Sequence, residues 1–120
     1  MSPEARLQAA CFEWFRYQYP KLKHLFFAIP NGGSRNKIEA LNLKKQGVTP
    51  GVPDTFLAVP KRPYSGLWIE FKHGSNTSTD EQARFLNLAS SVGYATAVIY
   101  SVDEFMTLVT NYLNRPNETP

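Results

Sequence analysis

The stretch LWIEFKHG, residues 67–74, constrains the fold of this chain more than any other segment. Successive side chains of a β-strand point to opposite faces of its sheet. One face therefore carries Leu67, Ile69 and Phe71, and the other carries Trp68, Glu70 and Lys72. A charge is costly to bury in a sheet unless it is paired or bound to a metal. We therefore expect Glu70 and Lys72 to have a structural partner or a chemical role.

Hydrophobic periodicity and turn residues divide the rest of the chain into alternating helices and strands. The predicted helices cover residues 3–18, 35–46, 79–91 and 102–113, and the predicted strands cover residues 24–29, 54–59, 67–72 and 94–100. The short loop of residues 60–66 favours an antiparallel pairing of the two middle strands. The order α-β-α-β-β-α-β-α predicts a single α/β domain, residues 1–113, around a mixed sheet, followed by a flexible tail, residues 114–120.

Capping signals mark where the predicted helices begin. Ser2 precedes Pro3 and caps the first helix, and Ser34 is the expected cap of the second. Thr79 with Gln82, and Ser101 with Glu104, have the form of capping boxes at the last two helices.

Composition places the chain among globular proteins and limits the classes of partner. Of its 120 residues, 42% are hydrophobic and 19% are charged, which is typical of a folded domain rather than a disordered one. The net charge of +3 favours an anionic partner such as nucleic acid, although an ordinary basic surface explains it equally well. A single cysteine, Cys11, predicts a buried thiol in a reducing cytoplasm. We expect no membrane segment, because no apolar run approaches ~20 residues.

The short loop between the middle strands brings Asp54 alongside Glu70. Two adjacent carboxylates repel each other unless a cation lies between them, and Mg²⁺ prefers such oxygen ligands. Asp54, Glu70 and the main-chain carbonyl of Phe71 would be the protein's ligands, and Lys72 could orient or deprotonate a water that attacks phosphorus. The structural alternatives are a cross-strand ion pair on a solvent-exposed face for Glu70 and Lys72 and a turn role for Asp54.

A second candidate site lies in the glycine-rich segment before the second predicted helix. Amide groups at a helix start bind anions, and glycine permits close approach of a phosphate. The candidate DNA-binding residues are Asn31, Gly32, Gly33, Ser34, Arg35 and Lys37. An ordinary turn is the alternative for this segment.

Taken together, these stretches resemble the VRR-NUC domain of the PD-(D/E)XK nuclease superfamily, in its small stand-alone phage form. The resemblance rests on EARLQAACFEWF, IPNGGSRNKIEALNLKKQGVTPGVPD, LWIEFKHG, the TDEQ helix start and VGYATAVIYS. It implies a restriction-endonuclease-like α-β-β-β-α-β core and a Mg²⁺- or Mn²⁺-dependent, structure-selective DNA endonuclease in the cytoplasm of a bacterial host.

The resemblance also implies roles for particular residues. Asp54 and Glu70 would be metal ligands and Lys72 the catalytic lysine. Glu4 would hold a metal-bound water or a second ion, with a helix-dipole role as the alternative and Glu13 as a competitor. Gln82 would hold the lysine or a water, with capping alone as the alternative.

The implied assembly is a homodimer that resolves four-way DNA junctions. Exposed aromatic side chains of the first and last helices are candidates for the dimer contact: Tyr17, Tyr19 and Tyr112. The alternative functions are a flap-cutting or nicking nuclease that works with a replication or recombination protein, and a non-catalytic DNA-binding module on the same fold.

Overall fold

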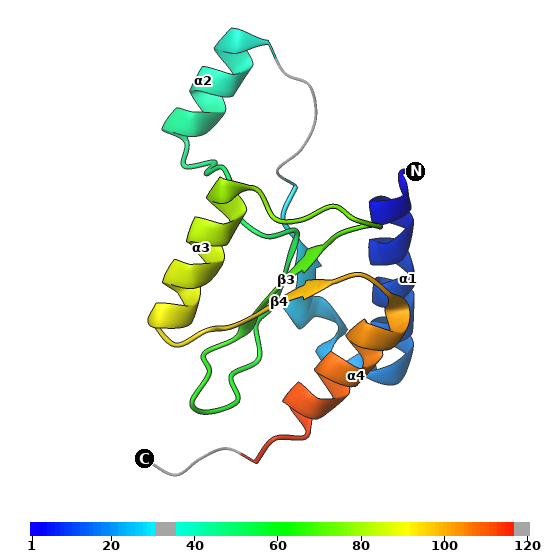
Figure 1. Ribbon diagram of the computed structural model, residues 1–120. Coiled ribbons are helices and arrows are strands. Elements are labelled where there is room, and N and C mark those ends of the chain that lie inside the picture. Colours follow the sequence, from blue (N-terminus) through cyan, green and yellow to red (C-terminus); the bar gives the residue numbers. More distant parts are fainter. Residues whose placement is uncertain (31–35, 117–120) are drawn as a thin grey trace.

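The structure is a computed structural model that describes residues 1–30 and 36–116 (Figure 1). Its helices are α1 (Pro3–Gln18), α2 (Lys37–Lys45), α3 (Asp80–Ser91) and α4 (Val102–Leu113), with a 3₁₀-helix, η1 (Pro20–Leu25), after α1. Its strands are β1 (Phe26–Ala28), β2 (Thr55–Leu57), β3 (Leu67–Phe71) and β4 (Ala95–Ile99). The predicted order of helices and strands is confirmed, with η1 added.

The strands form a mixed sheet in the order β1-β2-β3-β4. β1 pairs antiparallel with β2, β2 pairs antiparallel with β3, and β3 pairs parallel with β4. The predicted antiparallel pair is therefore confirmed. The predicted fold class, a mixed sheet flanked by helices, is confirmed as well.

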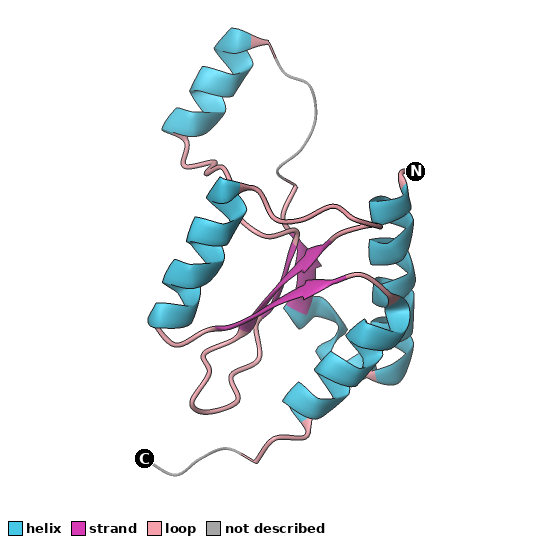
Figure 2. Ribbon diagram, viewed as in Figure 1, coloured by secondary structure: helices cyan, strands magenta, loops and turns pink. Residues whose placement is uncertain are grey.

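Helices cover both faces of the sheet (Figures 1 and 2): α1 and α4 lie on one face, and α3 lies on the other. The α1 and α4 face holds the main core, where Phe12 stacks on Phe26 with ring centroids 4.1 Å apart and Phe71 packs 6.0 Å from Phe105. Burying each such phenyl ring contributes about 1.5–3 kcal/mol to folding. This core fixes β1 and β3 relative to α1 and α4.

The side chains of β3 alternate as the sequence predicts. Leu67, Ile69 and Phe71 are at most 1% exposed in the main core. Trp68 points to the other face and meets Phe85 of α3, with ring centroids 5.0 Å apart. Glu70 shares that face, so α3 is the helix that can contact it.

Two predicted element starts are corrected. His24 and Leu25 belong to η1 rather than to a strand, because Pro20 opens a tight turn in which the Leu22 N–H donates to the Tyr19 carbonyl. The cap of α2 is Asn36 instead of Ser34: the Asn36 side chain accepts from the Glu39 N–H at 2.8 Å. Asparagine caps helices as well as serine does.

The expectation that Tyr112 is exposed was wrong. Its side chain is only 5% exposed, and its hydroxyl donates to the Val59 carbonyl at 2.7 Å. Tyr17, by contrast, is 86% exposed, and Cys11 is buried as predicted. Among residues 1–30 and 36–116, no helix is long and apolar enough to cross a membrane.

Candidate active site

Asp54 and Glu70 meet because β2 and β3 pair in a fixed register. Thr55 lies opposite Ile69, so the residue before β2 lies opposite Glu70. Asp54 is also held from its other side, where the Ile29 N–H donates to the Asp54 carbonyl at 2.8 Å. The sheet therefore brings both carboxylates to one end of the central strands, as the sequence predicts.

Main-chain amides orient the two carboxylates reciprocally. The Asp54 N–H donates to Glu70 Oε1 at 2.9 Å, and the Phe71 N–H donates to Asp54 Oδ2 at 2.9 Å. Each strand thus supplies a donor for the acid of the other strand. The positions of these carboxylates depend on the sheet itself rather than on a mobile loop.

Lys72 follows β3 directly and faces the same acid. Its Nζ lies 3.4 Å from Glu70 Oε2, and its main-chain N–H donates to the Ile99 carbonyl at 2.9 Å. Lys72 is 8% exposed and Glu70 is 2% exposed, so the ion pair is largely shielded from water. The structural alternative, an ion pair on a solvent-exposed face, does not describe these buried side chains.

Gln82 contacts the site from α3. Its Nε2 donates to Glu70 Oε2, with the two atoms 2.6 Å apart, while its Oε1 accepts from the Thr79 N–H at 2.9 Å in a complete capping box. Gln82 therefore caps α3 and contacts the candidate site at the same time. Its amide holds the glutamate, however, whereas the sequence led us to expect contact with the lysine or a water.

The electrostatics of Glu70 are those of a crowded acid. Burial, followed by the nearby charge of Asp54, raises the pKa of Glu70 to about 7, and Lys72 opposes this rise. Near neutral pH, Glu70 is therefore only partly ionised when no cation is bound. A divalent cation would favour the ionised form by offsetting the repulsion between the two carboxylates.

The donor set fits a hard divalent cation such as Mg²⁺. Two carboxylates on neighbouring strands supply oxygen ligands, and a carboxylate has about four acceptor sites, so the observed hydrogen bonds leave others for a metal. No group of three or more Asp, Glu, His or Cys side chains within residues 1–30 and 36–116 could hold an ion. The remaining ligands would be main-chain carbonyl groups, waters or substrate phosphate.

Glu4 lies at the start of α1 and contacts a loop rather than the two central acids. Asn76 Nδ2 donates to Glu4 Oε1 at 3.2 Å, and the Tyr100 hydroxyl donates to the Asn76 carbonyl at 2.7 Å. Asn76 thereby links α1 to the segment that follows Lys72. No local pattern in the sequence around Asn76 indicated this contact, because Glu4 is 72 residues away in the chain.

Gly51 supports the site from the loop that leads into Asp54. Its φ angle is +85°, and a Cβ atom placed there would lie 2.5 Å from the Glu81 carbonyl oxygen in the first turn of α3. Only glycine allows the loop to pass this close to α3 without strain. A glycine in a turn-rich stretch suggested a turn but gave no sign of this contact.

The predicted DNA-binding segment is only partly covered. Asn31, Gly32, Gly33, Ser34 and Arg35 lie outside the described residues. Lys37 is the first residue of α2 and is exposed. α2 itself projects away from the sheet (Figure 1).

Comparison with known proteins supports the fold. No protein-family model matches the chain, and no curated protein matches it. A solved structure described as a "VRR_NUC domain protein" superposes with a TM-score of 0.83 over 98% of this chain and 93% of that chain, at 24% sequence identity. The chain therefore has the fold of a VRR_NUC domain protein, which confirms the resemblance at the level of architecture.

Proposed function

We propose that this protein is a divalent-metal-dependent DNA endonuclease. The observation that carries the proposal is the buried cluster in which Glu70 accepts hydrogen bonds from the Asp54 N–H and Gln82 and lies 3.4 Å from Lys72. The fold shared with a VRR_NUC domain protein supports the same conclusion. A DNA-binding module without catalysis would have no need of two adjacent carboxylates at a surface that meets phosphate.

In the proposed site, Asp54 and Glu70 hold Mg²⁺ or Mn²⁺, and the Phe71 carbonyl completes the protein's ligands. When bound, such a metal polarises a phosphoryl oxygen and lowers the pKa of a water. Gln82 keeps Glu70 in position by donating to Oε2. Glu4 at the start of α1 is proposed to hold a water or a second ion.

Lys72 is proposed to act on the attacking water and on the phosphate. Its ammonium group can offset negative charge as it grows on the phosphate oxygens, and as a base it can take a proton from the water. The nearby Glu70 carboxylate keeps the ammonium group pointing into the site. The lysine therefore contributes to catalysis more than to ground-state binding.

The test is cleavage of labelled DNA with Mg²⁺, with Mn²⁺ or with EDTA. The panel contains a four-way junction, a flap, a linear duplex and a single strand, and the proteins are the parent and Lys72→Ala. We expect metal-dependent cutting by the parent and a loss of at least about 100-fold in the variant, the usual effect of removing a general acid or base. Binding measured in EDTA should change little.

Lys21→Ala is the matched control, because Lys21 is an exposed lysine of η1. Its cutting should equal that of the parent. Unchanged cutting by Lys72→Ala would refute the assigned role of Lys72. DNA binding without cleavage in any metal would favour the non-catalytic module instead.

We also propose a homodimer that cuts branched DNA, with four-way junctions as the preferred substrate. Two sites related by a two-fold axis can cut two strands symmetrically. Exposed apolar side chains are candidates for the contact: Tyr17, Ile38 and Leu41. The segment containing Asn31, Gly32, Gly33, Ser34, Arg35 and Lys37 is proposed to bind phosphate. Light scattering after size exclusion distinguishes dimer from monomer, and a monomer would favour flap cutting or nicking alongside a replication or recombination protein.

A further inference from the structure

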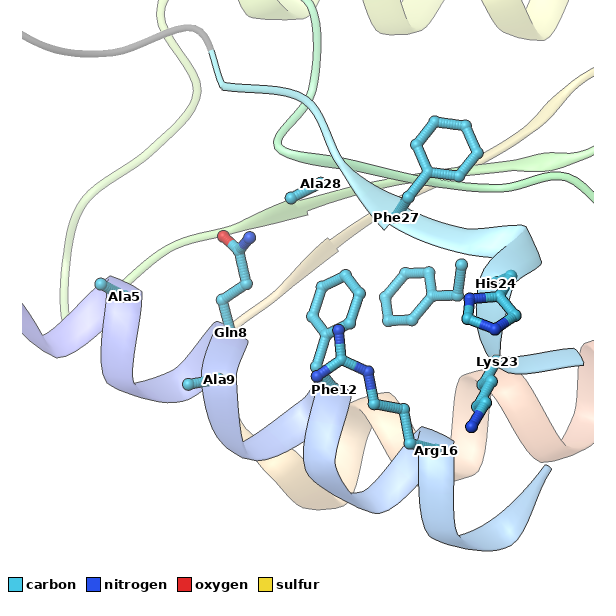
Figure 3. Close-up of a pocket in the computed structure, with 10 residues that line it drawn as sticks. Ala5, Gln8, Ala9, Phe12, Arg16, Lys23, His24, Phe27 and Ala28 are labelled. Carbon is cyan, nitrogen blue, oxygen red and sulfur yellow. The ribbon is translucent and has the colours of Figure 1, made fainter. Parts of the chain in front are cut away.

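A groove of about 660 Å³ runs between α1 and the segment formed by η1 and β1 (Figure 3). Ala5, Gln8 and Arg16 line it from α1, and Lys23, His24 and Ala28 line it from the other side. From Ala5 to Arg16 the helix rises about 17 Å, at 1.5 Å per residue. The groove is therefore an elongated channel, and neither the fold nor the proposed catalysis accounts for it.

The groove is basic at the end farthest from the start of α1. Arg16, Lys23 and His24 gather there, and the described residues that line the groove include neither Asp nor Glu. The guanidinium carbon of Arg16 lies 5.2 Å from the ring centroid of Phe12, so the arginine lies over the apolar floor of the groove. This distribution of charge favours binding of a polyanion over binding of an apolar small molecule.

The edge strand adds hydrogen-bond donors to the same groove. The Ile29 N–H donates to the Asp54 carbonyl and the Ala58 N–H to the Leu25 carbonyl, which fixes the alternation of the β1–β2 ladder. In an antiparallel pair the residues between the bonded positions direct their main-chain groups away from the partner. The N–H groups of Phe26 and Ala28 therefore face the outer edge of the sheet, and amides of this kind contact phosphate oxygens in DNA complexes.

The near end of the groove adjoins residues that contact the candidate active site. At its near end, Ala28 precedes Ile29, which bonds to Asp54, and Ala5 follows Glu4, which bonds to Asn76 beyond Lys72. Figure 3 shows the Gln8 amide directed across this end toward Ala28.

We propose that this groove binds the sugar-phosphate backbone of an unpaired DNA strand that leads away from the Asp54–Glu70–Lys72 site. The inference rests on the proposed nuclease function and adds DNA with a single-stranded arm to the branched substrates proposed above. A cavity of this volume is the size of a pocket for one small ligand, so it accommodates a few nucleotides of one strand and excludes a double helix. The ring of Phe27 points away from the cations, so binding depends on the backbone and not on base stacking (Figure 3).

An acidic peptide added to the edge of the sheet is the competing occupant. β1 has only three residues, so strand addition would gain few main-chain hydrogen bonds. The cations, moreover, lie at one end of the groove rather than along the whole edge. Both observations favour a nucleic-acid backbone, whose binding is dominated by phosphate charge.

The test measures fluorescence anisotropy of a labelled oligothymidine with the full chain in EDTA, over a series of salt concentrations. The double variant Arg16→Gln/Lys23→Gln is compared with Lys21→Gln, which removes an exposed lysine of η1 outside the groove. The slope of log K for DNA binding against log salt is negative. Loss of two phosphate contacts should reduce its magnitude by about 1.4, at roughly 0.7 per contact for single strands. The control should keep the slope of the parent. Circular dichroism confirms that each variant is folded.

The outcomes separate this inference from the proposed function. Parent-like affinity and slope in the double variant would overturn the groove assignment, even if the parent cuts DNA. If the salt dependence is reduced in the double variant but the parent cuts no DNA, the groove assignment would be supported and the proposed nuclease function refuted. Loss of polyglutamate binding in the double variant, with oligothymidine binding unchanged, would assign the groove to an acidic peptide and overturn the inference.

Discussion

Replacing Glu70 with glutamine should stabilise the metal-free protein above neutral pH. Glu70 is 2% exposed, and burial beside Asp54 raises its pKa from an ordinary 4.5 to about 7. Folding therefore favours the protonated acid. This contribution to stability is complete below about pH 4.5 and is lost as the pH rises through about 7. Glutamine imitates the protonated acid at every pH. The Glu70→Gln protein should therefore not lose this stability as the pH rises.

The magnitude follows from the same pKa. A rise from 4.5 to about 7 corresponds to roughly 3 kcal/mol, at about 1.4 kcal/mol for each pH unit. The attraction to Lys72 is already included, because it opposes the rise. The free energy of unfolding of Glu70→Gln, relative to the parent, should therefore increase by roughly 3 kcal/mol between about pH 4.5 and pH 8. In a domain of this size, the difference in melting temperature between the variant and the parent should change by roughly 10 °C over the same pH range.

The assay is guanidinium unfolding in EDTA at both pH values, with Glu13→Gln as the control. Glu13 is an exposed carboxylate of α1, and its replacement should change stability by less than about 0.5 kcal/mol. Adding Mg²⁺ at the higher pH should stabilise the parent by mass action and have little effect on Glu70→Gln. A variant whose difference from the parent is independent of pH would refute the reasoning about this buried acid.

Three further predictions concern packing and reactivity around the site. Gly51→Ala should destabilise the protein by at least about 1 kcal/mol more than Gly47→Ala. Both glycines have positive φ angles, but only a Cβ at position 51 would clash with the Glu81 carbonyl. Equal losses of stability in thermal unfolding would exclude the clash. Gln82→Ala should cut DNA more slowly than the parent because it frees Glu70 Oε2, and Gln82→Glu should be slowed as well because an ionised carboxylate cannot donate to Glu70; cutting rates equal to that of the parent in both variants would exclude this role of Gln82. Burial raises the pKa of the Cys11 thiol to about 12, so Ellman's reagent should label it only after denaturant is added, and rapid labelling of the native protein would contradict its burial.

Much of the fold follows from local signals in the sequence. The alternation in residues 67–72 predicted which side chains of β3 enter the core, and the capping box at Thr79 predicted the start of α3. The starts of β1 and α2 were less predictable, because Pro20 allowed a 3₁₀-helix and both Ser34 and Asn36 are good caps. Local patterns describe one segment at a time, so these boundaries depend on neighbours that the sequence does not reveal.

The convergence of the two strand acids and the lysine was predictable, but their hydrogen bonds and the place of Glu4 were not. Two acids and a lysine on adjacent strands indicated that Asp54, Glu70 and Lys72 converge. The reciprocal amide bonds, and the choice of Glu70 as the partner of Gln82, depend on register and on how α3 packs. Burial of Tyr112 was missed for the same reason, since the Val59 carbonyl that it contacts is 53 residues away in the chain. Contacts at such separations leave no local pattern.

The most direct test of the central claim is anomalous diffraction from crystals of the protein grown with Mn²⁺. The account predicts an anomalous peak within ligand distance of both Asp54 and Glu70, and its loss in crystals of Asp54→Asn. A folded protein that binds Mn²⁺ elsewhere, or shows no peak between these two carboxylates at saturating metal, would contradict the account.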